Sequence, residues 1–499
     1  MQKNQIKFIE QVHRKKNFSD AINFISEKFP NKTFLIFENI KITFKEFNFL
    51  INKTCNYFKN QNIKEKDIIS ICLKNSIESI IIYFSCIRYG VICSPIPYGV
   101  SEDSLKHFLK LSKSKFVFSN QKISNKNFNN IILNDYNDFL KKIGNCKDYF
   151  KNKKINGDNT AVYYFSSGTT AKPKLIKYSH NAMIACQKIL FESNYLNPFS
   201  IHMCLLPLGH TASLRYSIKN AIMNAGKVYL YKNFWEVKDS FWKEIKNKKI
   251  NFVGVVPTII QTLLYSHGKK KLKPKYLNFI GCGSSILSEE LQKKFEKKFK
   301  IPIANIYGMS EIGVATIENN KINKEKGTIG KPLKKVNIKL FDKKNFLVNK
   351  DNVSGEICIK SPALFSGYIP KNKMKKNNFI KKYFRTGDLA LWKDGNLKFL
   401  DRSKDIIIKG GVNIAPQEVD KCLQENINVS ESTTIGIKDN FFGEKILSYV
   451  VLKKYSKIKK SELLKYCENK IGKFRTPENI IFKNKLPKTA SGKVIKRFL

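Results

Sequence analysis

Apolar, β-rich runs alternate with lysine-rich amphipathic segments through the first four-fifths of this chain. The runs "FVGVVPTII" (residues 252–260) and "YLNFIGCGSS" (residues 276–285) have the apolar and β-branched content of buried strands. Between such runs lie helical patterns such as "SEELQKKFEKKFK" (residues 288–300). This alternation predicts an α/β fold in which helices flank sheets.

The pattern changes in the last third of the chain. Residues 327–400 read as short strands and turns, with glycine turn signals in "SGEICIKSP" and "DGNLKFLDR". A final unit of helix signals then follows, at "PQEVDKCLQEN" and "SELLKYCENKIG". We therefore predict an N-terminal domain over residues 1–400 and a C-terminal domain over residues 401–499, with the boundary near 401–404.

Charge is extreme, with a formal net charge of +51 over 499 residues. The cations are mostly lysines spread over every segment, and arginine, the better reader of bases and phosphates, is scarce. Such a surface helps to attract anionic ligands, but it has no clustered nucleic-acid footprint. The sequence predicts no nucleic-acid partner.

Cysteine usage and hydropathy indicate where in the cell the protein is expected. The eleven cysteines form no Cys-x-x-Cys pair and no zinc spacing, which predicts buried free thiols in a reducing cytoplasm. The beginning of the chain lacks an apolar stretch of signal-peptide length. The most apolar region, "IISICLKNSIESIIIYFSCIRYGVICSPIP", is interrupted by charges and predicts a helix followed by a strand in a core. We expect a cytoplasmic protein without stable membrane insertion.

One polar stretch, "YYFSSGTTAKPKLIKYSH" (residues 163–180), follows an apolar run directly. Gly168 permits backbone angles closed to other residues, and Pro173 prevents a helix from continuing. Hydroxyl donors come from Ser166, Ser167, Thr169 and Thr170. The stretch lacks the Gly-Lys-Ser/Thr ending of a Walker loop, so it predicts a different kind of anion-binding loop; an ordinary polar turn is the alternative.

Four further stretches follow this loop in order. They are "NIYGMSEIG" with Tyr307, Ser310 and Glu311 just after a short β run, "YFRTGDLALW" with Asp388 at a turn, "DRSKDIIIKGGVNIAPQEVD" with Arg402, Lys404 and Pro416, and "LPKTASGKVIKRFL" with Lys493. Each alone is a weak signal, since Gly-Asp is common in turns and a terminal lysine is commonly solvated. Their order and separation together make coincidence a poor explanation.

With these five stretches the sequence closely resembles the adenylate-forming superfamily of acyl- and aryl-CoA synthetases, luciferases and peptide-synthetase adenylation domains. The resemblance covers almost the whole chain and includes "GCGSSILSEEL", similar to the adenine-side loop, and "LPLGHTAS", similar to the motif that borders the acyl pocket. It implies a large N-terminal domain of two sheet-helix subdomains and a small β-barrel subdomain. A small, mobile α+β C-terminal domain would close over the site.

The resemblance also implies a binding site for ATP and Mg²⁺. The loop residues Ser166, Ser167, Gly168, Thr169, Thr170 and Lys174 would hold the pyrophosphate part of ATP. Glu311 would hold the magnesium ion, and Asp388 would accept hydrogen bonds from the ribose hydroxyls. Tyr307 would stack near the adenine, where Gly281 and Gly283 let the backbone approach the base.

The remaining implied roles concern catalysis and domain movement. Lys493, with Glu311 and Ser310, would act on the reacting groups, the lysine stabilising charge in the transition state. Arg402 is expected on the ribose or phosphate side, and Lys404 occupies the hinge position. Gly410 and Gly411 would form the loop that the pantetheine arm of the thiol acceptor approaches.

The chain departs from the superfamily pattern at four positions. Ala171 and Leu175 replace common glycines of the phosphate loop, Ser310 replaces a usual threonine, and Asp401 stands where glycine commonly precedes the arginine. Ser310 retains the hydroxyl, whereas Ala171 narrows the conformational freedom of the loop. We therefore expect a less open phosphate loop.

Substrate and acceptor follow from weaker signals. In the acyl-pocket motif, His210 stands where relatives that activate α-amino acids usually place an aspartate, which favours a fatty, aryl or related carboxylic acid. A structural role for His210 and an amino-acid substrate both stay open. CoA is the expected acceptor, and the phosphopantetheine of a carrier protein supplied in trans is the alternative. The rival functions are an enzyme that makes a product other than a thioester and an inactive basic binding protein.

Overall fold

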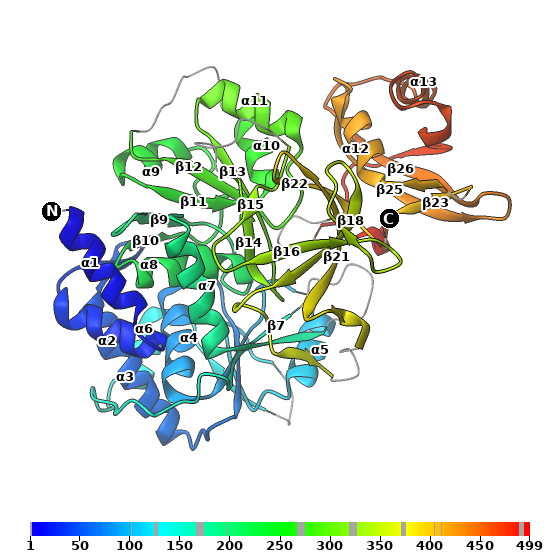
Figure 1. The fold of residues 1–499 in the computed structure, drawn as a ribbon. Coiled ribbons are helices and arrows are strands. Elements are labelled where there is room, and N and C mark those ends of the chain that lie inside the picture. Colours follow the sequence, from blue (N-terminus) through cyan, green and yellow to red (C-terminus); the bar gives the residue numbers. More distant parts are fainter. Residues whose placement is uncertain are drawn as a thin grey trace.

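The protein is described from a computed structural model. The structure describes residues 2–100, 102–123, 128–165, 174–195, 197–266, 275–318, 327–370, 376–403, 405–410, 412–488 and 494–499. Figure 1 shows a large body that carries the N-terminus and a smaller C-terminal part beside it. The body holds three sheets and the C-terminal part a fourth, so the predicted α/β fold with a large and a small domain is confirmed.

A seven-stranded sheet forms the first subdomain, in the order β19-β8-β7-β4-β3-β5-β6. Its strands are β3 (Ile68–Cys72), β4 (Ile92–Pro95), β5 (Phe116–Ser119), β6 (Asn129–Ile132), β7 (Thr160–Phe165), β8 (Leu175–Ser179) and β19 (Gly367–Ile369). The five strands from β7 to β6 along this order pair in parallel, and β8 and β19 add antiparallel pairs at one edge. The predicted phosphate loop therefore connects two antiparallel neighbours, β7 and β8.

The most apolar region is a strand, a helix and a strand, which corrects the prediction of a helix followed by a strand. It comprises β3, α4 (Ile77–Tyr89) and β4. The helix starts where the Ser76 hydroxyl accepts a hydrogen bond from the backbone of Ser79, and it ends at Gly90, whose φ of 88° is left-handed. The β-branched isoleucines before the cap form β3, which the prediction had joined to the helix.

A nine-stranded sheet forms the second subdomain, in the order β15-β14-β13-β12-β11-β9-β10-β1-β2. Its strands are β1 (Thr33–Phe37), β2 (Ile40–Thr43), β9 (Ile201–Cys204), β10 (Lys227–Leu230), β11 (Phe252–Val255), β12 (Phe279–Gly283), β13 (Ile303–Met309), β14 (Gly313–Ile317) and β15 (Lys331–Pro332). The middle strands are parallel, and β2, β14 and β15 pair antiparallel at the two ends. This is the geometry that the alternating sequence pattern predicts.

Two elements of this sheet refine the prediction. The strand expected over residues 252–260 ends at Val255, because Pro257 begins α10 (Pro257–Ser266), and proline is well suited to the first turn of a helix. The helix expected over residues 288–300 is confirmed as α11 (Glu289–Phe299). Its N-cap, Ser288, accepts a hydrogen bond from the backbone of Leu291.

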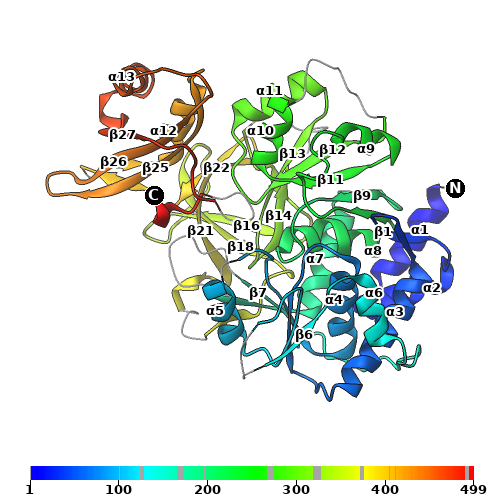
Figure 2. The ribbon, with the colours of Figure 1, turned by 180° about the vertical axis from the view of Figure 1, so that it is seen from behind.

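The remaining helices of the body belong to these two subdomains. They are α1 (Gln2–His13), α2 (Phe18–Lys28), α3 (Phe44–Asn60), α5 (Glu102–Ser112), α6 (Tyr136–Ile143), α7 (His180–Glu192), the π-helix η1 (Ser213–Lys219), α8 (Asn220–Met223) and α9 (Phe241–Asn247). Figure 2 shows α3, α4 and α6 together on one side of the body.

A six-stranded antiparallel sheet forms the third subdomain, the place of the expected small barrel. It comprises β16 (Asn337–Phe341), β17 (Leu347–Val348), β18 (Ser354–Lys360), β20 (Phe379–Ile380), β21 (Tyr383–Lys393) and β22 (Asn396–Arg402). Asp388 lies inside β21 and not at a turn, which corrects the prediction for this residue. Gly387 has a left-handed φ of 74°, a conformation that is common in turns, although here it lies inside a strand.

The C-terminal domain has its own sheet and its own core. Its strands are β23 (Ile407–Lys409), β24 (Val412–Ile414), β25 (Val429–Asp439), β26 (Gly443–Leu452) and β27 (Asn479–Phe482). The two predicted helices are confirmed as α12 (Pro416–Glu425) and α13 (Lys460–Ile471). The chain passes from the third sheet to the fourth between Arg402 and Ile407.

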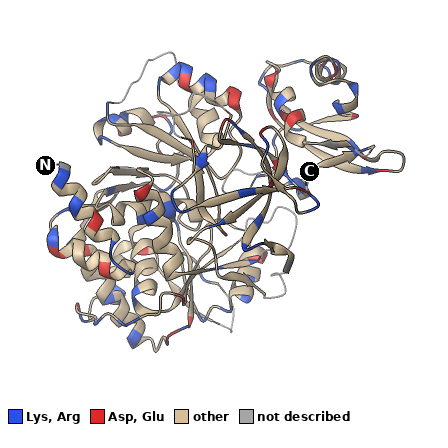
Figure 3. Ribbon diagram, in the orientation of Figure 1, with Lys and Arg blue, Asp and Glu red and all other residues tan. Residues whose placement is uncertain are grey.

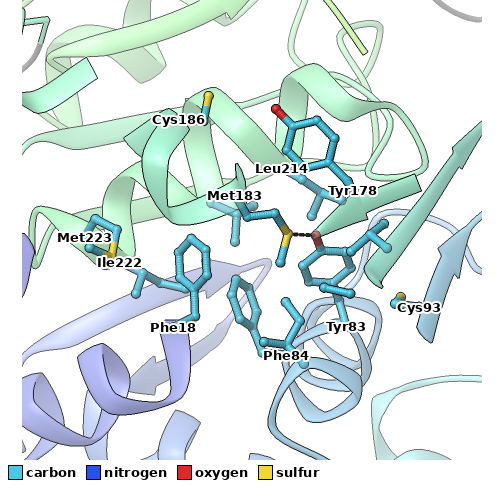
Figure 4. Close-up of a cluster of buried hydrophobic side chains, with 14 of the residues drawn as sticks. Phe18, Tyr83, Phe84, Cys93, Tyr178, Met183, Cys186, Leu214, Ile222 and Met223 are labelled. Carbon is cyan, nitrogen blue, oxygen red and sulfur yellow. Dashed lines mark hydrogen bonds between the residues drawn. The ribbon is translucent and has the colours of Figure 1, made fainter. Parts of the chain in front are cut away.

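The body is held together by a large apolar core. Figure 4 shows part of it, where Tyr83 and Phe84 of α4, Phe18 of α2 and Met183 of α7 meet. The Tyr83 hydroxyl donates a hydrogen bond to the Met183 sulfur at 3.6 Å. Ten of the eleven cysteines are buried, and all are free thiols, which confirms the prediction of unpaired cysteines.

Charge and hydropathy at the surface agree with the sequence. Figure 3 shows lysine and arginine positions over both the body and the C-terminal domain, without one dominant stripe on the ribbon. Among the described residues, no helix has the length and apolar character needed to cross a bilayer.

Candidate active site

A cleft of about 1390 Å³ lies where the body meets the C-terminal domain. Its lining includes nine of the residues singled out in the sequence: Lys174, His210, Gly281, Gly283, Tyr307, Ser310, Glu311, Asp388 and Arg402. The C-terminal domain contributes Pro416, Lys488 and Lys496, among others. Segments far apart in the sequence thus share one concave site of the size that a nucleotide and a second substrate need.

Several predicted residues are not in this set. Ser166, Ser167, Gly168, Thr169, Thr170, Ala171, Lys404, Gly411 and Lys493 lie outside the described residues. Gly410 is described and does not line the cleft. With a φ of 53°, it lies against the rings of Phe442 and Phe474 in the C-terminal domain.

Asp388 is a buried carboxylate of the cleft with two recorded partners. It is 4% exposed, and its Oδ2 accepts a 2.8 Å hydrogen bond from the Tyr307 hydroxyl. Arg402 is its partner across the β21–β22 pair, and Arg402 Nε lies 3.3 Å from Asp388 Oδ1. Burial, and then the charge of Asp388, raises the pKa of Tyr307 well above its usual value, so this phenol stays a hydrogen-bond donor.

Glu311 stands at the start of the turn after β13. Its Oε1 accepts a 3.0 Å hydrogen bond from the Tyr368 hydroxyl and lies 3.8 Å from Lys174 Nζ. The same ammonium group sits 3.4 Å from the centre of the Tyr368 ring. Burial, and then Glu311, raises the pKa of Tyr368. Lys174 is the one described member of the predicted phosphate-binding set, and it meets the predicted metal ligand directly.

The carboxylates fit a magnesium ion that is shared with phosphates. Within the described ranges, no three Asp, Glu, His or Cys side chains gather as a metal cage. Mg²⁺ is commonly bound by one or two carboxylates together with substrate phosphates and water. Glu311, 7% exposed and facing Lys174, supplies one such carboxylate.

Thr211, the residue after His210, lies next to Ser310 in the cleft lining. The hydroxyl oxygens of Thr211 and Ser310 are 3.5 Å apart, at the limit of a hydrogen bond. His210 Nδ1 accepts a 3.4 Å hydrogen bond from the backbone of Ala212. The acyl-pocket motif and the β13 turn therefore form one continuous wall.

Gly281 and Gly283 allow β12 to pack closely against its neighbours. A Cβ on Gly283 would lie 2.8 Å from the carbonyl oxygen of Ile306, and one on Gly281 would lie 2.9 Å from both Ile306 and Phe252. Side chains at these positions would push β13 away and fill the cleft. The two glycines therefore allow β12 and β13 to lie close together.

Tyr368 and the contacts of Asp401 were missed by the sequence analysis. Tyr368 holds both Glu311 and Lys174, but a lone tyrosine in "FSGYIP" carries no signal for such a role. Asp401 is buried, and its carboxylate accepts backbone hydrogen bonds from Arg402 (2.7 Å) and Gln417 (3.3 Å). Burial raises its pKa.

The Asp401 contact explains one departure from the superfamily pattern. The N-cap residue of α12, Ala415, makes no side-chain cap. Asp401, near the end of β22 in the third sheet, supplies a carboxylate to the first turn of that helix instead, where a negative charge is favourable. A glycine at this position could not link the two domains in this way.

Comparison with known proteins agrees with the geometry. A family model described as AMP-binding enzyme matches residues 24–369, and a second, described as AMP-binding enzyme C-terminal domain, matches residues 418–493. The first match covers more than half of the chain. The chain therefore belongs to the AMP-binding enzymes, which confirms the resemblance seen in the sequence.

Individual relatives are distant but similar over their full length. The chain is 24% identical to an oxalate–CoA ligase of Arabidopsis thaliana (96% of this chain, 97% of the relative). It is 26% identical to a 2-succinylbenzoate–CoA ligase of Bacillus licheniformis (95% and 98%). Among solved structures, ATP-bound MatB from Rhodopseudomonas palustris superposes with a TM-score of 0.89 at 21% identity (97% and 98%). MenE from Bacillus subtilis with ATP and magnesium ion superposes with a TM-score of 0.86 at 22% identity (96% and 98%).

Proposed function

We propose that this enzyme activates a carboxylic acid with ATP and then transfers the acyl group to the thiol of CoA. In the first step a carboxylate oxygen attacks the α-phosphorus of ATP, the bond to the β-phosphate breaks, and pyrophosphate leaves. In the second step the thiol sulfur attacks the acyl carbon and AMP leaves, with loss of the thiol proton. CoA ligases among the curated relatives support this reaction class.

The observation that carries the proposal is the convergence of two carboxylates and two cations on one cleft. Asp388 and Arg402 lie on the third sheet, while Glu311 follows β13 and Lys174 precedes β8. Carboxylate oxygens accept hydrogen bonds from ribose hydroxyls, whereas cationic side chains and a metal ion bind phosphate oxygens. An apolar ligand would not require these four charged groups in its binding site.

Each described group has a definite task in the proposal. Asp388, oriented by Tyr307, accepts hydrogen bonds from the ribose, and Arg402 lies beside it. Glu311 would hold magnesium, which supplies charge neutralisation on the phosphates when it is bound. Lys174 would move from Glu311 and the Tyr368 ring toward a phosphate oxygen. Tyr307 would also border the adenine, next to Gly281 and Gly283.

The residues outside the described ranges complete the proposed site. The hydroxyls of Ser166, Ser167, Thr169 and Thr170, with Gly168 between them, would cradle the pyrophosphate. Lys493 and Ser310 would stabilise charge on the transferring carboxylate and the α-phosphate.

The second step requires a rearrangement in this proposal. Gly410 lies outside the cleft lining, so the loop formed by Gly410 and Gly411 must come nearer for the thiol to arrive there. Rotation at Lys404, between the third and fourth sheets, would achieve this. The proposed domain boundary, 1–400 and 401–499, places the hinge at the beginning of the C-terminal domain. A carrier-protein phosphopantetheine is the alternative acceptor.

The acid is proposed to lie along the wall that contains His210. Oxalate and 2-succinylbenzoate are the acids in the names of the relatives, and each carries two carboxylates. Fatty and aryl acids, the classes favoured from sequence, belong in the same test. We propose a cytoplasmic location, which the eleven free thiols support.

A panel assay tests the proposed function. Purified protein is given ATP, Mg²⁺, CoA and one acid at a time from fatty, aryl, dicarboxylic and amino classes. Pyrophosphate release is followed continuously, and products are identified by mass spectrometry. A CoA thioester that forms with one acid class supports the proposal; pyrophosphate release that never depends on an acid contradicts it.

A further inference from the structure

Arg215 is a buried cation in the wall of the cleft. It lies on η1, is 5% exposed and belongs to the cleft lining together with its neighbours Tyr216 and Ser217. Its Nη1 donates a 2.8 Å hydrogen bond to the carbonyl oxygen of Gly313, two residues after Glu311. The guanidinium group therefore lies beside the segment that carries the proposed metal ligand.

No carboxylate of the described residues forms an ion pair with Arg215. The titratable groups that act on it are the thiol of Cys186 and the phenols of Tyr164, Tyr178 and Tyr216. Figure 4 shows Tyr178 beside Leu214, the residue before Arg215. Burial raises the pKa of Tyr178 and Tyr216, so neither phenol supplies a negative charge near neutral pH.

A buried charge of this kind calls for a counter-charge. A guanidinium has five N–H donors, and the recorded partners of Arg215 are two uncharged groups, the carbonyl oxygen of Gly313 and the phenol of Tyr216. Burying an unpaired charge is costly, whereas a bidentate carboxylate satisfies a guanidinium well. The cleft side of Arg215 is where such an anion can arrive.

Arg88 shows how this fold treats a buried arginine with a purely structural role. It is 1% exposed, lies far from the cleft lining, and donates through Nη1 to Asn52 (2.6 Å) and through Nη2 to Asn23 (3.0 Å). Two side-chain amides serve Arg88, and its Nε has no partner among the described residues, whereas Arg215 contacts the Gly313 carbonyl and the Tyr216 phenol and, unlike Arg88, lines the cleft.

Arg215 lines the cleft, so a bound substrate can contact it. Arg215 follows Thr211 by four residues, about one helical turn farther along the wall that faces Ser310. Phe252, Gly254 and Ile306 line the same cleft and add apolar surface. An acid with one carboxylate near Ser310 would extend past apolar groups toward the guanidinium.

We propose that Arg215 binds a second carboxylate of the substrate, so that the acid activated by this enzyme is a dicarboxylic acid. This inference rests on the proposed function and adds the substrate class and the residue that selects it. The carboxylate far from the reacting one pairs with Arg215 and provides the counter-charge that no described residue supplies. Acids with an apolar end leave the guanidinium unpaired and are rejected.

The first test uses the unaltered enzyme and matched pairs of acids. Each dicarboxylic acid, from oxalate through glutarate to an aryl dicarboxylate, is compared with its mono-amide and with the monocarboxylic acid of equal length. Acid-dependent pyrophosphate release gives kcat/KM for each. We expect a preference of about 10²-fold or more for one dicarboxylic acid over its two analogues. A monocarboxylic acid that equals or exceeds every dicarboxylic acid overturns the assignment but leaves acid activation intact.

Variants then connect the preference to the residue. Arg215→Met should reduce the preference for the dicarboxylic acid to within about tenfold, mainly through KM for the acid. Arg88→Met is the matched control, because it removes a buried arginine that lies away from the cleft. It should lower thermal stability and keep the preference.

The outcomes separate the two proposals. If Arg215→Met keeps the full preference, the assignment of Arg215 is wrong. If Arg215→Met does not fold, Arg215→Lys keeps the charge but loses the bidentate fork, and it should weaken the preference while remaining active. If no acid of any class stimulates pyrophosphate release, the proposed function itself fails.

Discussion

The Tyr307 hydroxyl donates a 2.8 Å hydrogen bond to Asp388 Oδ2, joining the last parallel strand of the nine-stranded sheet to the third sheet. Arg402 Nε lies 3.3 Å from the other oxygen of the same carboxylate. Asp388 is therefore oriented from two sides before any ligand arrives. A preorganised acceptor of this kind binds a diol without paying for its own reordering.

Substitution of Asp388 tests its role toward ATP. Asp388→Asn keeps the size of the side chain and replaces one acceptor oxygen with a donor, so we expect KM for ATP to rise about tenfold or more, about 1.4 kcal/mol. Tyr307→Phe removes only the orienting hydrogen bond and should raise KM by a few-fold. Steady-state kinetics with varied ATP measures both, and an unchanged KM in Asp388→Asn would place the ribose elsewhere.

Glu311 is expected to set the magnesium dependence. Glu311→Gln removes the charge that now faces Lys174 at 3.8 Å, and we expect activity at saturating ATP to fall about 10²-fold while the magnesium requirement rises. Magnesium titrations of pyrophosphate release provide the measurement.

Glu290 offers a matched control for this prediction. It pairs with Lys294 on α11 and does not line the cleft. Glu290→Gln should leave the magnesium titration as it is in the unaltered enzyme. An identical titration in Glu311→Gln would argue against a metal at Glu311.

The proposed hinge can be tested by restricting the backbone. Proline confines φ, so Lys404→Pro should hinder rotation of the C-terminal domain while Lys404→Ala should not. We expect Lys404→Pro to retain acid-dependent pyrophosphate release without CoA and to lose thioester formation by about tenfold or more. Equal loss of both half-reactions would point to misfolding or to a different hinge.

Stability should fall in mild acid because three histidines are buried as neutral imidazoles. Burial lowers the pKa of His13 and His180 to about 4, and of His202 to about 3, from 6.5. The unfolded chain therefore binds more protons below pH 6.5, and folding stability decreases as pH falls from 6.5 toward 4. Each histidine contributes a loss of about 2 kcal/mol between pH 6.5 and 5.

One substitution isolates this effect. His13 stacks on Phe191 with ring centres 4.2 Å apart, so His13→Phe keeps a stacked ring and removes the titrating group. Melting temperatures at pH 7, 6 and 5 should drop less steeply for His13→Phe than for the unaltered protein. Parallel curves would show that His13 does not titrate in this range.

Motif spacing identified residues that line one cleft, but it did not give their local structure. Asp388 reads as a turn residue because Gly387 precedes it, yet strand pairing with β18 and β22 keeps it inside β21. Pro257 marks a helix start that an apolar run hides. Strand pairing overrides the local turn preference at Asp388, whereas at Pro257 a local helix-start signal outweighs the apolar pattern.

Two contacts of the cleft could not be anticipated from the sequence. Tyr368 reaches Glu311 and Lys174 only because β19 pairs with β8 at the edge of the first sheet, far from both in the chain. Arg215 is of interest because no carboxylate of the described residues pairs with it, and the lack of a carboxylate partner has no sequence pattern. Both depend on long-range packing.

The measurement that tests the central claim most directly is acid-dependent exchange of labelled pyrophosphate into ATP. It isolates the first half-reaction and needs no thiol acceptor. Three proteins are compared: the unaltered enzyme, Lys493→Ala, and Lys485→Ala, a matched lysine on the same C-terminal segment that does not line the cleft. We predict exchange that requires an acid and Mg²⁺, is lost by about 10²-fold or more in Lys493→Ala, and is retained in Lys485→Ala. Exchange that is absent with every acid, or that survives in Lys493→Ala, would contradict the account.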